Sequence, residues 1–242
     1  MAQLNELESK VDEATLADFN RRLDMSWIYH DSALEGLVYS TSELEEALRS
    51  QLADSSSMLP VYDEVRQHKT AIDWVRQAAG NRKELNLDLV KKLLLILAPE
   101  EGEGKGPPRY RKDVPLHRLY LHEISPPEKI GYKMRQLMQW VGSLETKRHT
   151  HPARVAAKAH YTFLHIYPFA KHNGKLGRLL MNFLLLREGY PPAVIHATDR
   201  QRYYEALKGS SDTLAALVHE ALTNSVETAI RYFSSPARAK AL

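Results

Sequence analysis

The sequence predicts a mainly α-helical protein with one small β element. Apolar residues recur at helical spacing along most of the 242 residues, whereas strand-like alternation is confined to one short stretch. A Gly- and Pro-rich segment at 99–108 interrupts this pattern. A second interruption, at 167–178, lies between two apolar segments and combines Gly, Asn and cationic side chains. The first two observations predict the fold class, and the third indicates where the function lies.

The first 98 residues predict a helical region. Apolar residues are spaced for helices over 4–11 and 16–27. Ser42 precedes a run of acidic residues and is a candidate N-cap, because hydroxyl caps and acidic first turns both stabilise a helix N-terminus. Two further helices are predicted over 65–78 and 85–97, the first ended by Gly80 and Asn81.

The segment beyond the first interruption predicts a core domain. Residues 109–122 alternate loosely and predict a hairpin, and helices follow over 130–144 and, after Thr150 and Pro152, over 153–166. Residues 176–187 are apolar on nearly every side and predict a central, buried helix. Asp199 and Asp212 are candidate caps of the last two helices. The predicted organisation is an N-terminal helical region over 1–98, a core over 99–235 and a C-terminal tail over 236–242.

Composition excludes several classes of protein. Hydrophobic residues make up 43% and charged residues 26%, as in ordinary soluble proteins, and no apolar run is long enough to span a membrane. The absence of cysteine excludes disulfides and thiolate metal sites. The net charge of +3 comes from clusters with few interleaved aromatic residues, which favours a solvated surface over nucleic-acid binding. We therefore expect a cytoplasmic protein with neither nucleic acid nor membrane as partner.

The second interruption has the chemistry of an anion site. A short loop that leads directly into a helix places backbone N–H groups and the positive end of the helix dipole at one point. Glycines let the backbone approach a ligand closely, and cationic side chains attract it. The residues expected to bind phosphate are Asn173, Gly174, Lys175 and Arg178.

This stretch resembles the active-site loop of the Fic/Doc (Fido) family, His-Pro-Phe-x-Asp/Glu-Gly-Asn-Gly-Arg-x-x-Arg. The length agrees without a gap, and the matching positions are Pro168, Phe169, Asn173, Gly174 and Arg178. Four positions depart from the pattern: Tyr167 stands for the catalytic His, Lys171 for the acid that binds Mg²⁺, His172 for Gly and Lys175 for Arg.

Other segments extend the resemblance over residues 25–232. Residues 109–122 resemble the hairpin flap that aligns a target protein beside the loop. Residues 32–36 resemble an inhibitory helix, in which Glu35 would pair with Arg178 and exclude the terminal phosphate of ATP; Asp31 stands where that motif has Ser or Thr. The resemblance implies a Fic-type helical bundle with a small β-hairpin flap, and transfer of AMP from ATP to a hydroxyl group.

The departures alter the proton chemistry that the resemblance implies. A tyrosine with an ordinary pKa is phenolate in about one part in a thousand at pH 7, a shortfall of about 4 kcal/mol for a base. Tyr167 is therefore a handicapped base, a phenolic nucleophile that becomes modified itself, or a core aromatic residue. His172 is a better candidate for handling a proton near the phosphates, with a plain loop residue as the alternative. His165, two residues before Tyr167, points in another direction and is expected to pack elsewhere.

The departures also alter the electrostatics. A carboxylate attracts Mg²⁺, whereas the ammonium of Lys171 repels a metal and suits a phosphate. With Lys175 and Arg178 it predicts three cations around one helix N-terminus, and nucleotide binding without an obligate metal; a role for Mg²⁺ is left open. A solvated cation is the alternative for Lys171, and an ordinary surface acid for Glu35. The spacing of the histidines predicts no metal site of their own.

Two functions follow from these residues and the resemblance. One is a Fic-type nucleotidyltransferase with altered chemistry, taking ATP or another nucleotide as donor and a hydroxyl as acceptor, with catalytic roles for Tyr167, His172 and Lys171. The other is a catalytically impaired pseudoenzyme that binds a nucleotide or a partner protein.

Overall fold

A computed structural model describes residues 1–49, 59–102, 106–115 and 122–234. Within these ranges the chain is helical, and no strand is present. The elements are α1 (Ala2–Glu8), α2 (Glu13–Leu34), α3 (Thr41–Arg49), α4 (Leu59–Gly80), α5 (Leu87–Leu97), η1 (Pro99–Glu101), α6 (Pro127–Gly142), α7 (Leu144–His149), α8 (Pro152–Ile166), α9 (Asn173–Arg187), η3 (Ala197–Asp199), α10 (Arg200–Lys208) and α11 (Ser211–Phe233).

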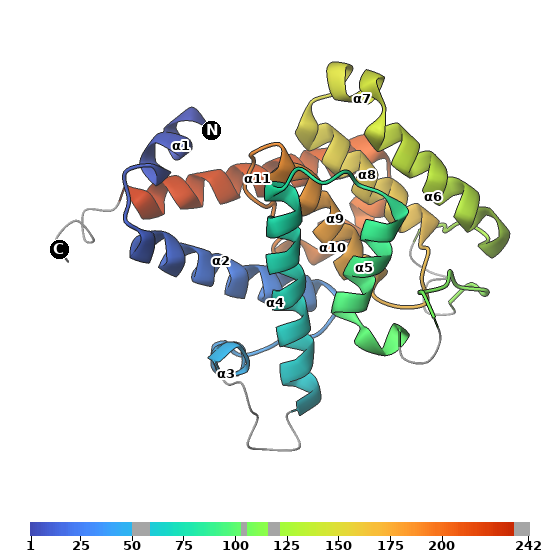
Figure 1. The fold of residues 1–242 in the computed structure, drawn as a ribbon, viewed down its shortest axis with the longest axis horizontal. Helices are drawn as coiled ribbons and strands as arrows, with labels where there is room; N and C mark the ends of the chain where they lie inside the picture. The colour runs from blue at the N-terminus through green and yellow to red at the C-terminus, as the bar shows by residue number, and fades with distance from the viewer. Residues whose placement is uncertain (50–58, 103–105, 116–121, 235–242) are drawn as a thin grey trace.

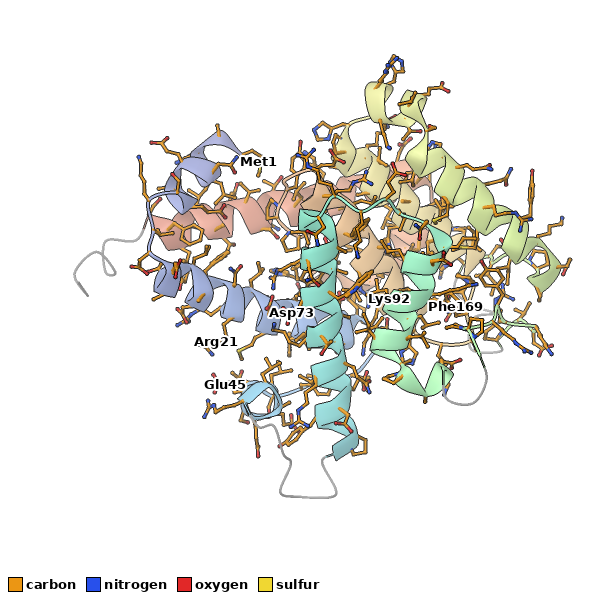
Figure 2. All side chains as sticks on the ribbon, viewed as in Figure 1. Met1, Arg21, Glu45, Asp73, Lys92 and Phe169 are labelled. Carbon is orange, nitrogen blue, oxygen red and sulfur yellow. The ribbon has the colours of Figure 1, made fainter. Side chains whose placement is uncertain are left out.

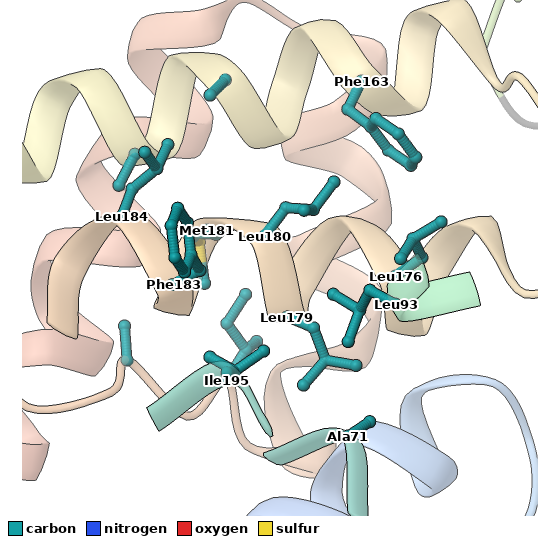
Figure 3. Close-up of a cluster of buried hydrophobic side chains, with 14 of the residues drawn as sticks. Ala71, Leu93, Phe163, Leu176, Leu179, Leu180, Met181, Phe183, Leu184 and Ile195 are labelled. Carbon is teal, nitrogen blue, oxygen red and sulfur yellow. The ribbon is translucent and has the colours of Figure 1, made fainter. Parts of the chain in front are cut away.

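Helix α9 is the centre of the molecule, as its sequence predicts. It is buried along almost its whole length, and Leu176, Leu179 and Met181 are fully covered. Apolar side chains of α8, such as Phe163, meet it on one side, while Ala71 of α4 and Leu93 of α5 meet it on the other (Figure 3). An apolar surface on every side is stable only where neighbouring helices cover it.

The remaining helices surround this centre in two groups (Figure 1). The N-terminal helices α2, α4 and α5 pack directly against α9, so the predicted N-terminal region shares the core's central helix. Helices α6 and α11 pack against α8, and α10 and the short α1 pack against α11. The division at residue 98 stays a prediction, and 236–242 lie outside the described residues.

Helix starts differ from the sequence prediction at two caps. Helix α3 begins after Ser40 rather than Ser42: Glu43 N–H donates to Ser40 Oγ at 3.2 Å, and Ser40 N–H donates to the Glu43 carboxylate at 2.7 Å. This reciprocal pair satisfies two backbone donors that a cap at Ser42 would leave open. Ser210 rather than Asp212 caps α11, accepting from Thr213 N–H.

The predicted hairpin at 109–122 is only partly within the described residues, because 116–121 lie outside them. The described part, 109–115, contains no strand. The hairpin therefore stays a prediction. In the described parts of the chain, no helix combines the length and the hydrophobicity that crossing a membrane requires.

Candidate functional site

The loop that resembles the Fic motif joins the end of α8 to the start of α9. Both ends of the loop have left-handed backbone: Tyr167 has φ 50° at the C-cap of α8, and His172 has φ 61° at the N-cap of α9. Such conformations cost non-glycine residues about 1–3 kcal/mol each. Glycine is the residue best suited to this geometry, which explains why a Gly-to-His departure at position 172 places strain at the loop.

Asn173 holds the loop together. Its side-chain amide donates to the carbonyl of Phe169 at 2.7 Å and to that of Lys171 at 3.3 Å, and its Oδ1 accepts from Phe169 N–H at 3.0 Å. Helix α9 begins at this residue, three positions earlier than predicted. The amide of Asn173 is therefore engaged in shaping the loop, whereas the sequence prediction assigned it to phosphate.

A cavity of about 670 Å³ opens at the N-terminus of α9. Six of the eight predicted site residues line it: Glu35, Tyr167, His172, Asn173, Gly174 and Arg178. Helix α10 forms the other wall and contributes Arg200, Tyr203, Tyr204 and Lys208. Lys171 is exposed, Lys175 is buried on α9, and neither of them lines the cavity.

Arg178 is fully buried and held by two carboxylates of the α2 end. Its Nε donates to the Asp31 side chain at 2.8 Å, and its Nη2 donates to the Asp31 carbonyl at 3.0 Å and to Glu35 Oε1 at 2.9 Å. Burial lowers the pKa of Arg178, but Asp31, Tyr203 and Glu35 raise it well above its usual range. The predicted Glu35–Arg178 contact is thus present, whereas Asp31 was not predicted as a partner.

Asp31 is as deeply buried as Arg178. Burial raises the pKa of its carboxyl, but Arg178 and His68 outweigh burial and hold the pKa below its usual range. His68 of α4, itself buried, places Nε2 3.3 Å from the second Asp31 oxygen. Asp31 and Glu35 are four residues apart, the spacing that puts two side chains on one helix face. That spacing is the sequence signal from which Asp31 could have been found.

Glu35 lies against the first turn of α9. A Cβ built on Gly174 would overlap with the Glu35 carboxylate, so a larger residue at this position requires that carboxylate to move. The carboxylate of Glu35 therefore occupies the helix N-terminus, which is the place expected for a bound anion.

Lys175 is buried and pairs with Glu64 of α4. Burial raises the pKa of Glu64, but Lys175 outweighs burial and lowers it. Of the three cations predicted around one helix N-terminus, Arg178 and Lys175 are paired with carboxylates, and Lys171 is exposed. Glu64 stands 111 residues before Lys175, and no local pattern connects them.

Two of the residues predicted for proton chemistry, Tyr167 and His172, line the cavity. Tyr167 is 7% exposed, and its backbone carbonyl accepts from Arg111 Nε at 2.7 Å. Burial and the charge of Lys175 lower the pKa of His172, whereas Glu35, Glu100 and Glu64 raise it. A lowered pKa keeps His172 neutral at pH 7 and able to accept a proton. His165 packs against the rings of Tyr161 and His122, away from the cavity, as expected.

The donor set at the loop does not suit Mg²⁺. Magnesium prefers carboxylate oxygens and phosphate oxygens, and the position of the family's acid holds an exposed ammonium group, Lys171. Over the described ranges, no group of three or more His, Asp or Glu side chains is arranged to hold a metal ion. We therefore derive no step through a protein-bound metal.

A short loop leads into the buried central helix of a helical scaffold, and Glu35 from the C-terminal end of α2 lies against the first turn of that helix. Comparison with known proteins specifies the class: the Fic/DOC family model matches residues 84–185. This match, together with the relatives and solved structures below, supports a member of the Fic/Fido family. The matched segment begins between α4 and α5, contains the whole loop, and ends within α9.

Curated relatives carry the same family name. Protein adenylyltransferase Fic of Drosophila ananassae is 28% identical over 220 residues, covering 85% of this chain and 42% of that protein. The protein of the same name from Drosophila virilis is 29% identical over 187 residues, covering 75% of this chain and 36% of its own length. This chain thus spans less than half of these relatives.

Solved structures agree on the fold. A Fic domain containing signaling protein from Bacteroides thetaiotaomicron superposes with a TM-score of 0.82 at 22% identity, over 96% of this chain and 94% of that one. Fic-1 from C. elegans, residues 134–508, gives 0.79 at 22% identity, over 99% and 71%. At these identities the likeness establishes the fold alone.

Proposed function

We propose that the cavity at the N-terminus of α9 binds a nucleotide such as ATP, and that the protein transfers its nucleotidyl group to a hydroxyl acceptor. One observation carries this proposal: the cavity brings together the loop residues Tyr167, His172 and Gly174 with Arg178, and an acid from α2 closes it. The relatives' name, protein adenylyltransferase, supports AMP as the transferred group.

The walls of the cavity suit the two ends of a nucleotide. The N-terminal turn of α9 offers backbone N–H groups to phosphate oxygens once Glu35 moves aside. On α10, Arg200 places Cζ 5.2 Å from the centre of the Tyr204 ring. The stacked pair offers a flat surface for a base. Glu35 in its present position competes with the terminal phosphate for the same place.

In the proposed transfer, the acceptor oxygen forms a bond to the α-phosphorus, the bond from that phosphorus to the β-phosphate oxygen breaks, and diphosphate leaves. The acceptor proton must go to a base. His172 takes that role in our proposal, because its pKa is lowered and it lines the cavity. Tyr167 then lies beside the acceptor, where its phenol donates or accepts a hydrogen bond.

The second candidate is a pseudoenzyme that binds a nucleotide or a partner protein without turnover. The observation that favours it is the engagement of both cations of the motif by carboxylates, together with tyrosine at the position of the family's base. Both candidates use the same cavity, and only turnover separates them.

Calorimetry with ATP, AMP and inorganic triphosphate tests the site. We expect Glu35→Gly to bind ATP roughly tenfold more tightly than the natural chain, and AMP with a smaller gain, because only ATP reaches the place that Glu35 vacates. Glu188→Gly is the matched control, since Glu188 also follows the last residue of a helix but lies outside the cavity. If neither the natural chain nor Glu35→Gly gives binding heat with any of the three ligands, the proposal is refuted.

Mass spectrometry after incubation with ATP separates the two candidates. A transferase leaves nucleotidyl groups on its own hydroxyl side chains or on an added protein acceptor, and Tyr167 is the first position to inspect. The double change Tyr167→His with Lys171→Asp restores the family's base and acid. If only the doubly changed protein leaves nucleotidyl groups and the natural chain leaves none, the natural chain is a pseudoenzyme.

A further inference from the structure

Three of the four carbonyl groups at the end of α8 are bound by Arg111, His122 and Ser125, whereas Phe163 O accepts from Tyr167 N–H. A helix end leaves four carbonyls without intrahelical partners, and buried ones need donors from elsewhere. Here the donors come from 111–125, the residues around the predicted flap. Leu164 O lies 3.0 Å from His122 Nε2, and His165 O accepts from Ser125 N–H at 2.8 Å.

Arg111 completes this set. Its Nε donates to Tyr167 O at 2.7 Å, its Nη2 reaches Ile166 O at 3.4 Å and Ser125 O, and its Nη1 donates to Asp113 O at 2.9 Å. Its backbone N–H donates to Pro168 O at 3.0 Å. One residue therefore binds three consecutive carbonyls across the junction between α8 and the loop.

The charge of Arg111 has no carboxylate partner among the residues that the structure describes, although the residue is only 6% exposed. Its neutralisation comes from carbonyl dipoles and from the negative end of the α8 helix dipole, both of which favour a cation at this point. By contrast, Arg109 in the same segment is exposed. Among the described residues the guanidinium is bound by carbonyl groups, and it fixes the relative position of every group that it binds.

We propose that Arg111 is a positioning residue: it holds Tyr167 in its left-handed backbone conformation at the cavity and fixes the flap segment to the loop. Its relevance to transfer rests on the proposed function, whereas its action on Tyr167 does not.

The electrostatics agree with this geometry. Burial lowers the pKa of Arg111, and the neighbouring Tyr167 acts in the opposite direction. The guanidinium and the phenol therefore interact electrostatically, and by reciprocity the positive charge of Arg111 favours the phenolate form of Tyr167. Removal of the guanidinium thus changes both the placement of Tyr167 and its readiness to ionise.

The test compares Arg111→Met and Arg111→Lys with the control Arg109→Gln. In the ligand-free protein we expect Arg111→Met to speed hydrogen exchange at the Tyr167 and Ser125 amides by roughly tenfold or more, with Arg111→Lys between Met and the natural chain. Exchange in α11 and in Arg109→Gln should stay as in the natural chain. Unchanged protection at Tyr167 in both Arg111 variants overturns the proposal.

A second measurement distinguishes positioning from mere stabilisation. Titration of the Tyr167 ring by NMR, with its signal assigned from Tyr167→Phe, should give a higher pKa in Arg111→Met and a smaller rise in Arg111→Lys. An unchanged titration in both variants contradicts the proposal. If ATP binding also fails in Glu35→Gly, the proposed function falls while these two measurements still decide the role of Arg111.

Discussion

The two buried cations of the loop motif, Arg178 and Lys175, are bound in different ways. Arg178 meets carboxylates of α2, and its partner Asp31 is buried as completely as Arg178 itself. Lys175 meets Glu64 of α4, whose side chain is 34% exposed. Water reaches the second pair and not the first. The Arg178 contacts therefore resemble a fixed part of the core, with Glu35 as its one partly exposed member, whereas the Lys175 pair is open to exchange.

This difference matters for ligand binding. A buried charge pair is expensive to separate, since each lone ion loses its only compensation. In the proposed function, a phosphate that enters the cavity displaces Glu35 from Arg178, because the Glu35 side chain is 28% exposed, and leaves the buried Asp31 in place. The accessible part of this site is thus the N-terminal turn of α9, with Arg178 contributing charge from below.

The comparison predicts its largest effect on stability. Arg178→Met should lower the free energy of unfolding by about 3–5 kcal/mol, because it leaves Asp31 buried without its cation. Lys175→Met should lower it by about 1–2 kcal/mol, because Glu64 regains hydration. Urea unfolding of the two variants measures both values. Equal losses would show that the two pairs are not distinguished by burial.

Gly174 gives a second test, directed at the partly exposed member. Gly174→Ala should cost about 1–3 kcal/mol, because the added methyl overlaps with the Glu35 carboxylate. In Glu35→Gly the same change should be neutral or slightly stabilising, since Ala is a better helix former than Gly. A double-mutant cycle by urea unfolding measures the coupling. Additive effects would place Glu35 away from the α9 N-terminus in solution.

The outline of this arrangement was predictable from the sequence, and its details were not. The apolar run of α9 predicts a central helix, and the loop motif predicts Glu35 near Arg178, because both signals are local or follow from the resemblance. The pairing of Lys175 with Glu64 joins distant segments, and burial of Arg111 contradicts its place in a basic cluster. A charged side chain carries no local sign of a partner on a distant helix, so the sequence predicts three cations around the helix N-terminus but not the Lys175–Glu64 pair.

Ion pairs of α2, α3 and α4, away from the loop, also show which contacts the sequence can predict and which it cannot. Arg21, Glu45 and Asp73, labelled in Figure 2, lie where α2, α3 and α4 meet, away from Phe169 at the loop. Exposed pairs such as Arg49–Glu45 follow the helical spacing that sequence reading uses. The buried pair of Asp24 with Arg76 does not, because it joins two helices. Local spacing thus finds surface pairs and misses the buried ones that fix helix positions.

The pH dependence of stability tests the deeply buried side of the comparison. His160 contacts Tyr203, the hydroxyl that also reaches Arg178, and burial, with Arg178, lowers its pKa from 6.5 to about 3. The unfolded chain therefore binds a proton below pH 6.5 that the folded chain refuses, so stability falls as pH drops from 6.5 towards 3. The slope is about 1.4 kcal/mol per pH unit for one such group.

His160→Gln removes this group while it keeps a hydrogen-bonding side chain beside Tyr203. We expect the variant to lose less stability than the natural chain between pH 6.5 and 4, measured by urea unfolding at each pH. His151→Gln is the control, because His151 is exposed. If the stability of the natural chain and that of His160→Gln fall in parallel with pH, the pKa of His160 is not lowered by its buried position beside Arg178.

The smallest expected effect on stability and on ATP affinity comes from Lys171, which is exposed and does not line the cavity. Lys171→Ala should change the free energy of unfolding by less than about 0.5 kcal/mol, as for other exposed positions. It should also leave ATP affinity in the Glu35→Gly background within roughly twofold, because its ammonium contributes only screened charge. Calorimetry at two salt concentrations measures this. A larger, salt-dependent loss would mean that Lys171 turns towards the phosphates on binding and provides the free cation that neither Arg178 nor Lys175 supplies.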